Sequence, residues 1–250
     1  MQELPHTSQF SQARFHTTQW EIVRQASEPE SEEGRAALEQ FCAAYWYPLY
    51  AFLRRQGHQA DDSADLVQGF FADFLSRDDL KKVEQESGRL RSYLLSALRN
   101  FASNQRARQA AQKRGGHLIL VSVERERAEA RYSVEPKDHQ TPERAFERSW
   151  AVTILERALD RLSEEQESRG RRDVFQRLVG YLSGTPPEGG LAEAAADSAL
   201  STSALKVALH RLRRRYRELL RQEVRETLGP EQDVDQELDV LLVALDTDGD

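Results

Sequence analysis

Apolar residues recur along this chain at steps of three and four positions, the spacing that places them on one face of a helix. In the first half, such stripes run through residues 36–55, 66–75 and 90–101. The pair Gly115-Gly116 follows the third stripe and is typical of a helix end. We therefore expect a helical domain over residues 20–116, after a flexible N-terminus at 1–19.

A second set of stripes begins near Pro142 and ends in a long basic helix. There the apolar positions step by 4, 3, 4 and 3, at Leu205, Leu209, Leu212, Tyr216 and Leu219. This pattern predicts a second helical domain over residues 145–226. The mixed charge of residues 117–144 favours a flexible, extended linker, although the apolar run 118–123 could also form a short strand. The predicted fold class is all-α, with two helical domains joined by a flexible linker and the second ending in a helix-turn-helix.

Charge is distributed unevenly over the 250 residues, whose formal net charge is −7. Residues 89–117 contain seven basic side chains and no acidic one, and residues 206–225 contain eight basic against two acidic. Residues 226–250 contain nine acidic side chains and no basic one. The chain therefore offers two candidate surfaces for a polyanion, followed by an acidic tail at 227–250.

The residue patterns of common catalytic and metal sites are missing from the sequence. There is one cysteine, and no two of the six histidines have zinc-ligand spacing. No glycine-rich loop opens a helix, and no nucleophile is placed beside a base. The acids at Asp61, Asp62 and Asp65 fit a capped helix start better than a nuclease. We expect no catalytic residue, no cofactor and no metal.

Targeting and membrane segments are not expected either. The N-terminus lacks the basic and apolar regions of a signal peptide, and no apolar run reaches about 18 residues. These features predict a cytoplasmic protein without a membrane partner.

The end of the second predicted domain has the order helix, short turn, helix. A short run at 193–196 supplies the first helix, and hydroxyl residues at 201–203 can cap the second. In a helix-turn-helix the second helix lies in the major groove, where its first turn meets base edges and its cations meet phosphates. The candidate DNA contacts are Ser201, Thr202, Ser203, Lys206, Val207, His210, Arg211 and Arg214. An ordinary amphipathic hairpin remains the alternative.

The basic segment of the first domain differs in kind, because aromatic and amide side chains stand among its cations. This combination suits single-stranded or opened nucleic acid. The candidate contacts are Arg89, Arg91, Tyr93, Arg99, Asn100, Asn104, Arg106, Arg108, Lys113 and Arg114. Tyr93 and Phe101 also belong to the apolar stripe, so both rings could be core residues instead.

The preceding helix is acidic and polar on one side and aromatic on the other. Its phenylalanines could pack in the core or form an exposed patch for a protein partner. The candidate contacts on this helix are Asp65, Leu66, Gln68, Phe70, Phe71 and Phe74.

The order and spacing of these segments resemble the bacterial RNA polymerase sigma factors, specifically the small two-domain extracytoplasmic-function type. Residues 90–94 with Arg99, Asn100 and Asn104 are similar to the family's region two, and residues 193–211 are similar to its region four. The aromatic run 44–50 and the basic end at 112–116 resemble a subgroup abundant in planctomycetes. The resemblance covers about residues 20–225.

The sequence departs from the family at several positions. Ala199 replaces the turn glycine before the recognition helix, and Ser198 replaces an apolar neighbour. Asn104 stands where an acidic residue is frequent, and Tyr93 stands where the family has tryptophan.

The resemblance implies a protein without chemistry of its own. Its first domain would bind the beta-prime and beta subunits of core RNA polymerase through residues 65–74 and would help to open the minus-ten promoter element. Its second domain would read the minus-thirty-five element, and an anti-sigma factor could regulate it. The rival interpretation is a helix-turn-helix regulator that binds duplex DNA as a dimer without polymerase. A protein-binding adaptor is a third class.

The acidic tail carries apolar residues at helical spacing, from Val234 to Leu245. This pattern predicts a helix that caps the second domain. Alternatively, the tail would shield the arginine-rich helix 206–225 until a partner displaces it.

Overall fold

A computed structural model describes residues 31–76, 89–111, 122–134, 141–182, 184, 186, 189–196, 200–229 and 231–246. Within these ranges the chain is helical and contains no strand, which confirms the all-α fold class. The helices are α2 (Glu32–Arg55), α3 (Ala60–Ser76), α5 (Leu90–Ala111), α6 (Ser122–Val134), α7 (Pro142–Ser168), α8 (Arg172–Leu178), η3 (Val179–Tyr181), α9 (Gly190–Ala196), α10 (Thr202–Glu226) and α11 (Val234–Leu245). None of these helices is long and apolar enough to cross a membrane.

Short polar side chains define where several helices begin. The Ser201 hydroxyl accepts a hydrogen bond from the Ala204 N–H (3.2 Å), and the Thr141 hydroxyl accepts one from the Arg144 N–H (3.3 Å). Such caps satisfy backbone donors that the first turn leaves without partners. Asp61 and Asp62 lie inside the first turn of α3, where their charge still favours the helix start.

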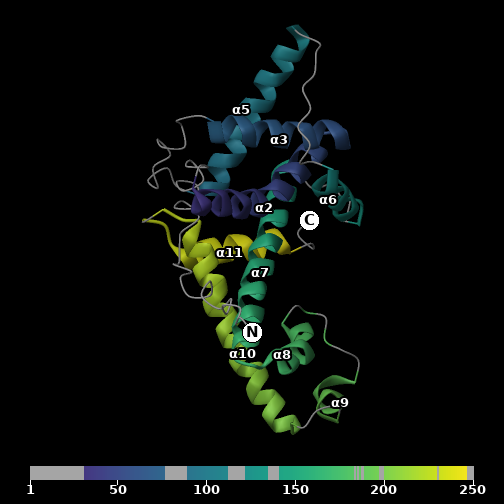
Figure 1. Cartoon of the computed structure of the whole chain (residues 1–250), viewed down its shortest axis with the longest axis vertical. Coiled ribbons are helices and arrows are strands. Elements are labelled where there is room, and N and C mark those ends of the chain that lie inside the picture. The colour runs from purple at the N-terminus through teal and green to yellow at the C-terminus, as the bar shows by residue number, and fades with distance from the viewer. Residues whose placement is uncertain are drawn as a thin grey trace, which may run out of the picture.

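Two hydrophobic cores lie one above the other, and α7 runs through both (Figure 1). The first half of α7 packs against α2 through Phe146, Trp150 and Ile154, which are all buried. Its second half contributes Ala158 and Leu162 to the other core, together with α8 and α10. A continuous helix of 27 residues therefore joins the two cores.

The ends of α10 and α11 return to the first core. Val224 and Leu228 near the end of α10, and Leu241 of α11, are buried in the same cluster as the phenylalanines of α2 and α3. In Figure 1, α11 crosses just below α2, and the far end of α5 projects beyond the other helices. Residues 234–245 of the acidic tail thus form a helix packed on the body of the protein, as their pattern predicts.

The predicted extended linker is wrong over residues 122–134, which form α6. This helix is docked on α2: the Tyr50 hydroxyl donates to the Glu129 carboxylate, Arg54 pairs with Glu129 at 3.0 Å, and the Arg131 guanidinium lies 4.1 Å from the Tyr47 ring centre. Polar contacts with a distant helix hold α6 in place, so hydrophobic periodicity could not show it. Residues 117–121 and 135–140, like the predicted N-terminus 1–19, lie outside the described residues.

Candidate nucleic-acid interface

The first half of α10 separates an apolar face from a polar one. Leu205, Leu209 and Leu212 are buried in the second core. The polar face is turned to solvent and carries Ser201, Ser203, Lys206, Val207, His210, Arg211 and Arg214, of which Arg214 is 78% exposed. Thr202 is half-buried. The structure therefore places seven of the eight residues expected to contact DNA along one accessible stretch of helix.

The helix before α10 is short, as the sequence predicts. Leu191 and Ala195 of α9 pack against the second core, and α9 contacts α10. Residues 197–199 between the two helices lie outside the described residues, which includes the substituted positions Ser198 and Ala199. The helical order of a helix-turn-helix is thus present, while the turn itself is undescribed.

A groove of about 720 Å³ lies beside the start of α10. Val174, Phe175 and Val207 supply apolar lining, and arginines from the end of α7, the start of α8 and α10 also line it. These arginines are Arg169, Arg171, Arg211 and Arg215. Cations and the N-terminus of a 25-residue helix are therefore close together, an arrangement that favours anions such as phosphate.

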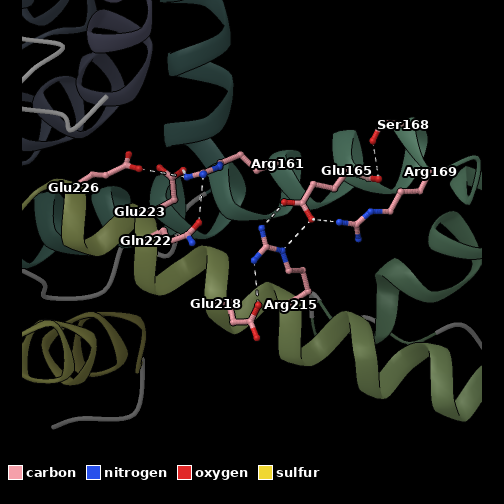
Figure 2. Close-up of polar contacts among 9 residues, drawn as sticks. All are labelled: Arg161, Glu165, Ser168, Arg169, Arg215, Glu218, Gln222, Glu223 and Glu226. Carbon is pink, nitrogen blue, oxygen red and sulfur yellow. Dashed lines mark hydrogen bonds and ion pairs between the residues drawn. The ribbon is translucent and has the colours of Figure 1, made fainter. Parts of the chain in front are cut away.

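The opposite side of α10 is attached to α7 by ion pairs (Figure 2). Arg215 donates two hydrogen bonds to Glu165, at 2.6 and 2.9 Å, and a third to Glu218. These donors lower the pKa of the Glu165 carboxyl, and the hydrogen bonds from Arg215 and Arg214 lower that of Glu218. Arg215 is therefore part of the scaffold that holds α10.

A second group of charges lies further along the same seam. Glu223 is buried and pairs with Arg161 at 2.6 Å and with Arg157 at 2.9 Å. Burial, followed by the charge of nearby Glu223, raises the pKa of Glu226 to about 7, although Arg161 lies 3.6 Å from its carboxylate. Burial also raises the pKa of Tyr216 to about 12, and its hydroxyl donates to the Leu155 carbonyl. These groups fix helix against helix.

The start of α5 is arranged differently from the start of α10. Arg91 is only 4% exposed; it pairs with Glu237 of α11 at 2.8 Å and with Glu147 of α7 at 3.1 Å. Arg89 pairs with the other Glu237 oxygen at 2.8 Å. The expectation that Arg91 lies on an accessible basic face is therefore wrong in this arrangement, because distant carboxylates cover it.

The remaining candidates on α5 divide into three groups. Tyr93 is half-buried with its ring 6.1 Å from that of Phe74, so it packs at the edge of the core. Arg99, Asn100 and Asn104 are exposed, and Arg99 pairs with Glu143. Arg106 and Arg108 fall on the last turns of α5, but their side chains lie outside the described residues, as do Lys113, Arg114 and the predicted helix end at 115–116.

The phenylalanines of α3 are core residues. Phe70, Phe71 and Phe74 are buried, and their rings pack against Phe41 of α2 and Phe101 of α5. The exposed aromatic patch considered from the sequence is therefore not formed, since rings from two neighbouring helices cover these side chains. On the outer face of α3, Asp65 is exposed, whereas Leu66 and Gln68 are half-buried.

Sequence reasoning missed the acidic partners of the basic segments. Glu237 is 1% exposed between two arginines, and Glu129 joins α6 to α2. A sequence signal existed for Glu237 alone, as an acid within an apolar helical stripe. Among the described residues, no group of three or more His, Cys, Asp or Glu could hold a metal ion.

Comparison of the chain with protein-family models, with curated proteins and with solved structures gives no match. The functional argument therefore rests on the residues and geometry described above.

Proposed function

We propose that this chain is a bacterial sigma factor of the extracytoplasmic-function type, which binds core RNA polymerase and directs promoter recognition, DNA opening and transcription initiation. The observation that carries the proposal is the outward face of α10, where Lys206, His210 and Arg211 are exposed beside a capped helix start. The resemblance of the ordered motifs over residues 20–225 links this face to a polymerase-dependent function.

In this proposal, α9 and α10 form a helix-turn-helix that reads the minus-thirty-five element. The first turn of α10, with residues 201–203 and Val207, would meet base edges in the major groove. Lys206, Arg211 and Arg214 would contact phosphates, which position the helix without reading sequence. The ion pairs to Glu165 and Glu223 support this role because they hold α10 by its other side.

The first core would serve the minus-ten element and the polymerase. Arg99, Asn100 and Asn104 are the accessible described candidates for opened DNA, and α5 continues beyond them toward the basic residues at 106–114. The outer face of α3, with Asp65, Leu66 and Gln68, is the candidate contact for the beta-prime and beta subunits. The phenylalanines beneath that face would keep it rigid.

This mechanism involves binding without bond chemistry. Two weak DNA contacts on one polymerase-bound chain reinforce each other, since the first raises the effective concentration of the second. The negative charge elsewhere would suppress non-specific DNA binding by the free protein.

A matched pair of variants tests the proposal with the full-length chain. Arg211→Ala removes an exposed arginine from the α10 face, and Arg127→Ala removes an exposed arginine from α6. We expect Arg211→Ala to weaken binding to promoter duplex by roughly tenfold and to lower the salt slope by about one, while Arg127→Ala changes neither. Co-elution of the chain with purified core polymerase tests the second half of the proposal, and failure to co-elute would contradict it.

One observation favours the rival regulator. The burial of Arg91 removes charge from the first basic segment, which weakens the case for a second DNA surface. A dimeric chain that binds duplex DNA, leaves polymerase unchanged and does not co-elute with it would support this alternative. Absence of any salt-dependent DNA affinity would instead support the adaptor class.

A further inference from the structure

Helix α11 covers the start of α5. Glu237 reaches Arg89 through one carboxylate oxygen and Arg91 through the other, each at 2.8 Å. These pairings connect residues that lie 146 positions apart in the case of Arg91. Leu241, one helical turn further along, is buried in the first core, so α11 is anchored by a charge and by an apolar side chain.

The same helix also contacts α10. Arg221 binds both carboxylate oxygens of Asp235, near the end of α10 that adjoins the first core. The cations on the first half of α10 belong to the other core. The tail therefore does not shield the outward face of α10, and its effect is concentrated on α5.

The attachment of α11 is limited in extent. Leu242 and Val243 are 65% and 69% exposed, so the helix contributes only one face to the body. A helix of 12 residues has little stability of its own in water. Undocking would also uncover Arg89 and Arg91 together, which restores the pair of cations missing from the accessible basic face of α5.

We propose that Arg89 and Arg91 form a nucleic-acid phosphate site that α11 occupies in cis through Glu237. This inference rests on the proposed function and deepens it, because it names a control on access to the first DNA surface. A carboxylate and a phosphate compete for the same guanidinium donors. Binding of single-stranded DNA at the start of α5 and docking of α11 would therefore exclude each other.

Two full-length variants undock α11 by different routes. Glu237→Gln removes the charge that pairs with both arginines, whereas Leu241→Ala removes the apolar anchor and leaves all charges in place. Asp239→Asn is the matched control, since it removes the same charge from an exposed position of the same helix. Binding is measured with a short fluorescent single-stranded oligothymidine over a series of salt concentrations. Amide hydrogen exchange follows residues 90–95 and 234–245.

The proposal expects faster exchange in both segments for Glu237→Gln and Leu241→Ala. It also expects oligothymidine affinity to rise about tenfold at low salt, with a salt slope steeper by about two, because two phosphate contacts are gained. Asp239→Asn should behave as the wild type in both measurements.

Other results would overturn the proposal in distinguishable ways. If the wild type binds oligothymidine and the undocked variants bind it equally well, Glu237 is only a structural partner and the proposed function survives. An equal gain with Asp239→Asn would show a general charge effect and overturn competition at Arg89 and Arg91. If no variant binds oligothymidine at any salt concentration, the DNA-opening part of the proposed function fails, and the competition that depends on it fails too.

Discussion

The start of α5 and the first half of α10 are two similarly basic segments that the fold treats in opposite ways. Arg91 of α5 is buried between Glu237 and Glu147, which come from other helices. Arg211 and Arg214 of α10 remain exposed, and the ion pair printed along that face is a local one, between Arg214 and Glu218 on the same helix. Arginine content is therefore a poor guide to an interface unless the acids brought in by tertiary structure are known.

The contrast between the two segments should be largest in stability. Arg91→Ala leaves Glu237 with half of its pairing in a buried position, and we expect it to lower the free energy of unfolding by about 3–5 kcal/mol. Arg211→Ala removes an exposed side chain and should stay within about 0.5 kcal/mol of the wild type. Urea unfolding of both variants measures the difference. Equal stabilities would mean that Arg91 is not held as described.

The second half of α10 differs from both segments because its charges respond to pH. The pKa of Glu226, about 7 in the folded state against 4.5 as its ordinary value, makes the folded chain bind the proton more tightly. Stability should therefore fall as pH rises between these values and level off above the higher one. Glu226→Gln removes this loss and should be more stable than the wild type by about 2 kcal/mol at pH 8, with little difference near pH 5.

Thermal or urea unfolding across that pH range provides the measurement. Asp160→Asn, at an exposed position of α7, is the control and should follow the wild type throughout. A Glu226→Gln variant whose stability parallels the wild type at every pH would show that Glu226 is ionised at no cost in the folded protein.

The cap of α10 distinguishes a structural hydroxyl from a DNA-contacting one on the same turn. Ser201→Ala removes the acceptor for the Ala204 N–H and should cost about 1 kcal/mol of stability. Ser203→Ala should leave stability unchanged, and any loss of duplex affinity would then come from its contact with DNA. Similar destabilisation by both changes would remove this distinction.

The smallest expected effect concerns the seam between α7 and α10. A double-mutant cycle of Arg215→Ala and Glu165→Gln should give a coupling energy of about 0.5–1 kcal/mol, because the pair is partly exposed and shares two hydrogen bonds. The more exposed pair of Arg172 and Glu167 should give a coupling near zero. A larger coupling in the exposed pair would contradict the assigned role of the seam.

Features that depend on neighbouring residues could be predicted from the sequence. The apolar stripe of α10, its cap at Ser201 and the exposure of Lys206 and Arg211 all follow from helical spacing and local hydrogen bonding. The helical form of residues 234–245 followed from the same spacing.

Features that depend on distant partners could not be predicted. Helix α6 is stabilised through Glu129 by Tyr50, which lies 79 positions away. The burial of Arg91 likewise requires the docking of α11. The phenylalanines of α3 looked too numerous for one helix face until Phe41 and Phe101 supplied the surface that covers them. A single sequence shows the periodicity of each helix but not which helices meet.

Run-off transcription with the full-length chain, purified core RNA polymerase and a library of genomic fragments tests the proposed function most directly. We expect transcripts from a restricted set of fragments that share two sequence elements, and we expect Arg211→Ala to reduce their yield while Arg127→Ala does not. Transcription that is no greater or more selective than that of core polymerase alone would contradict the proposed function.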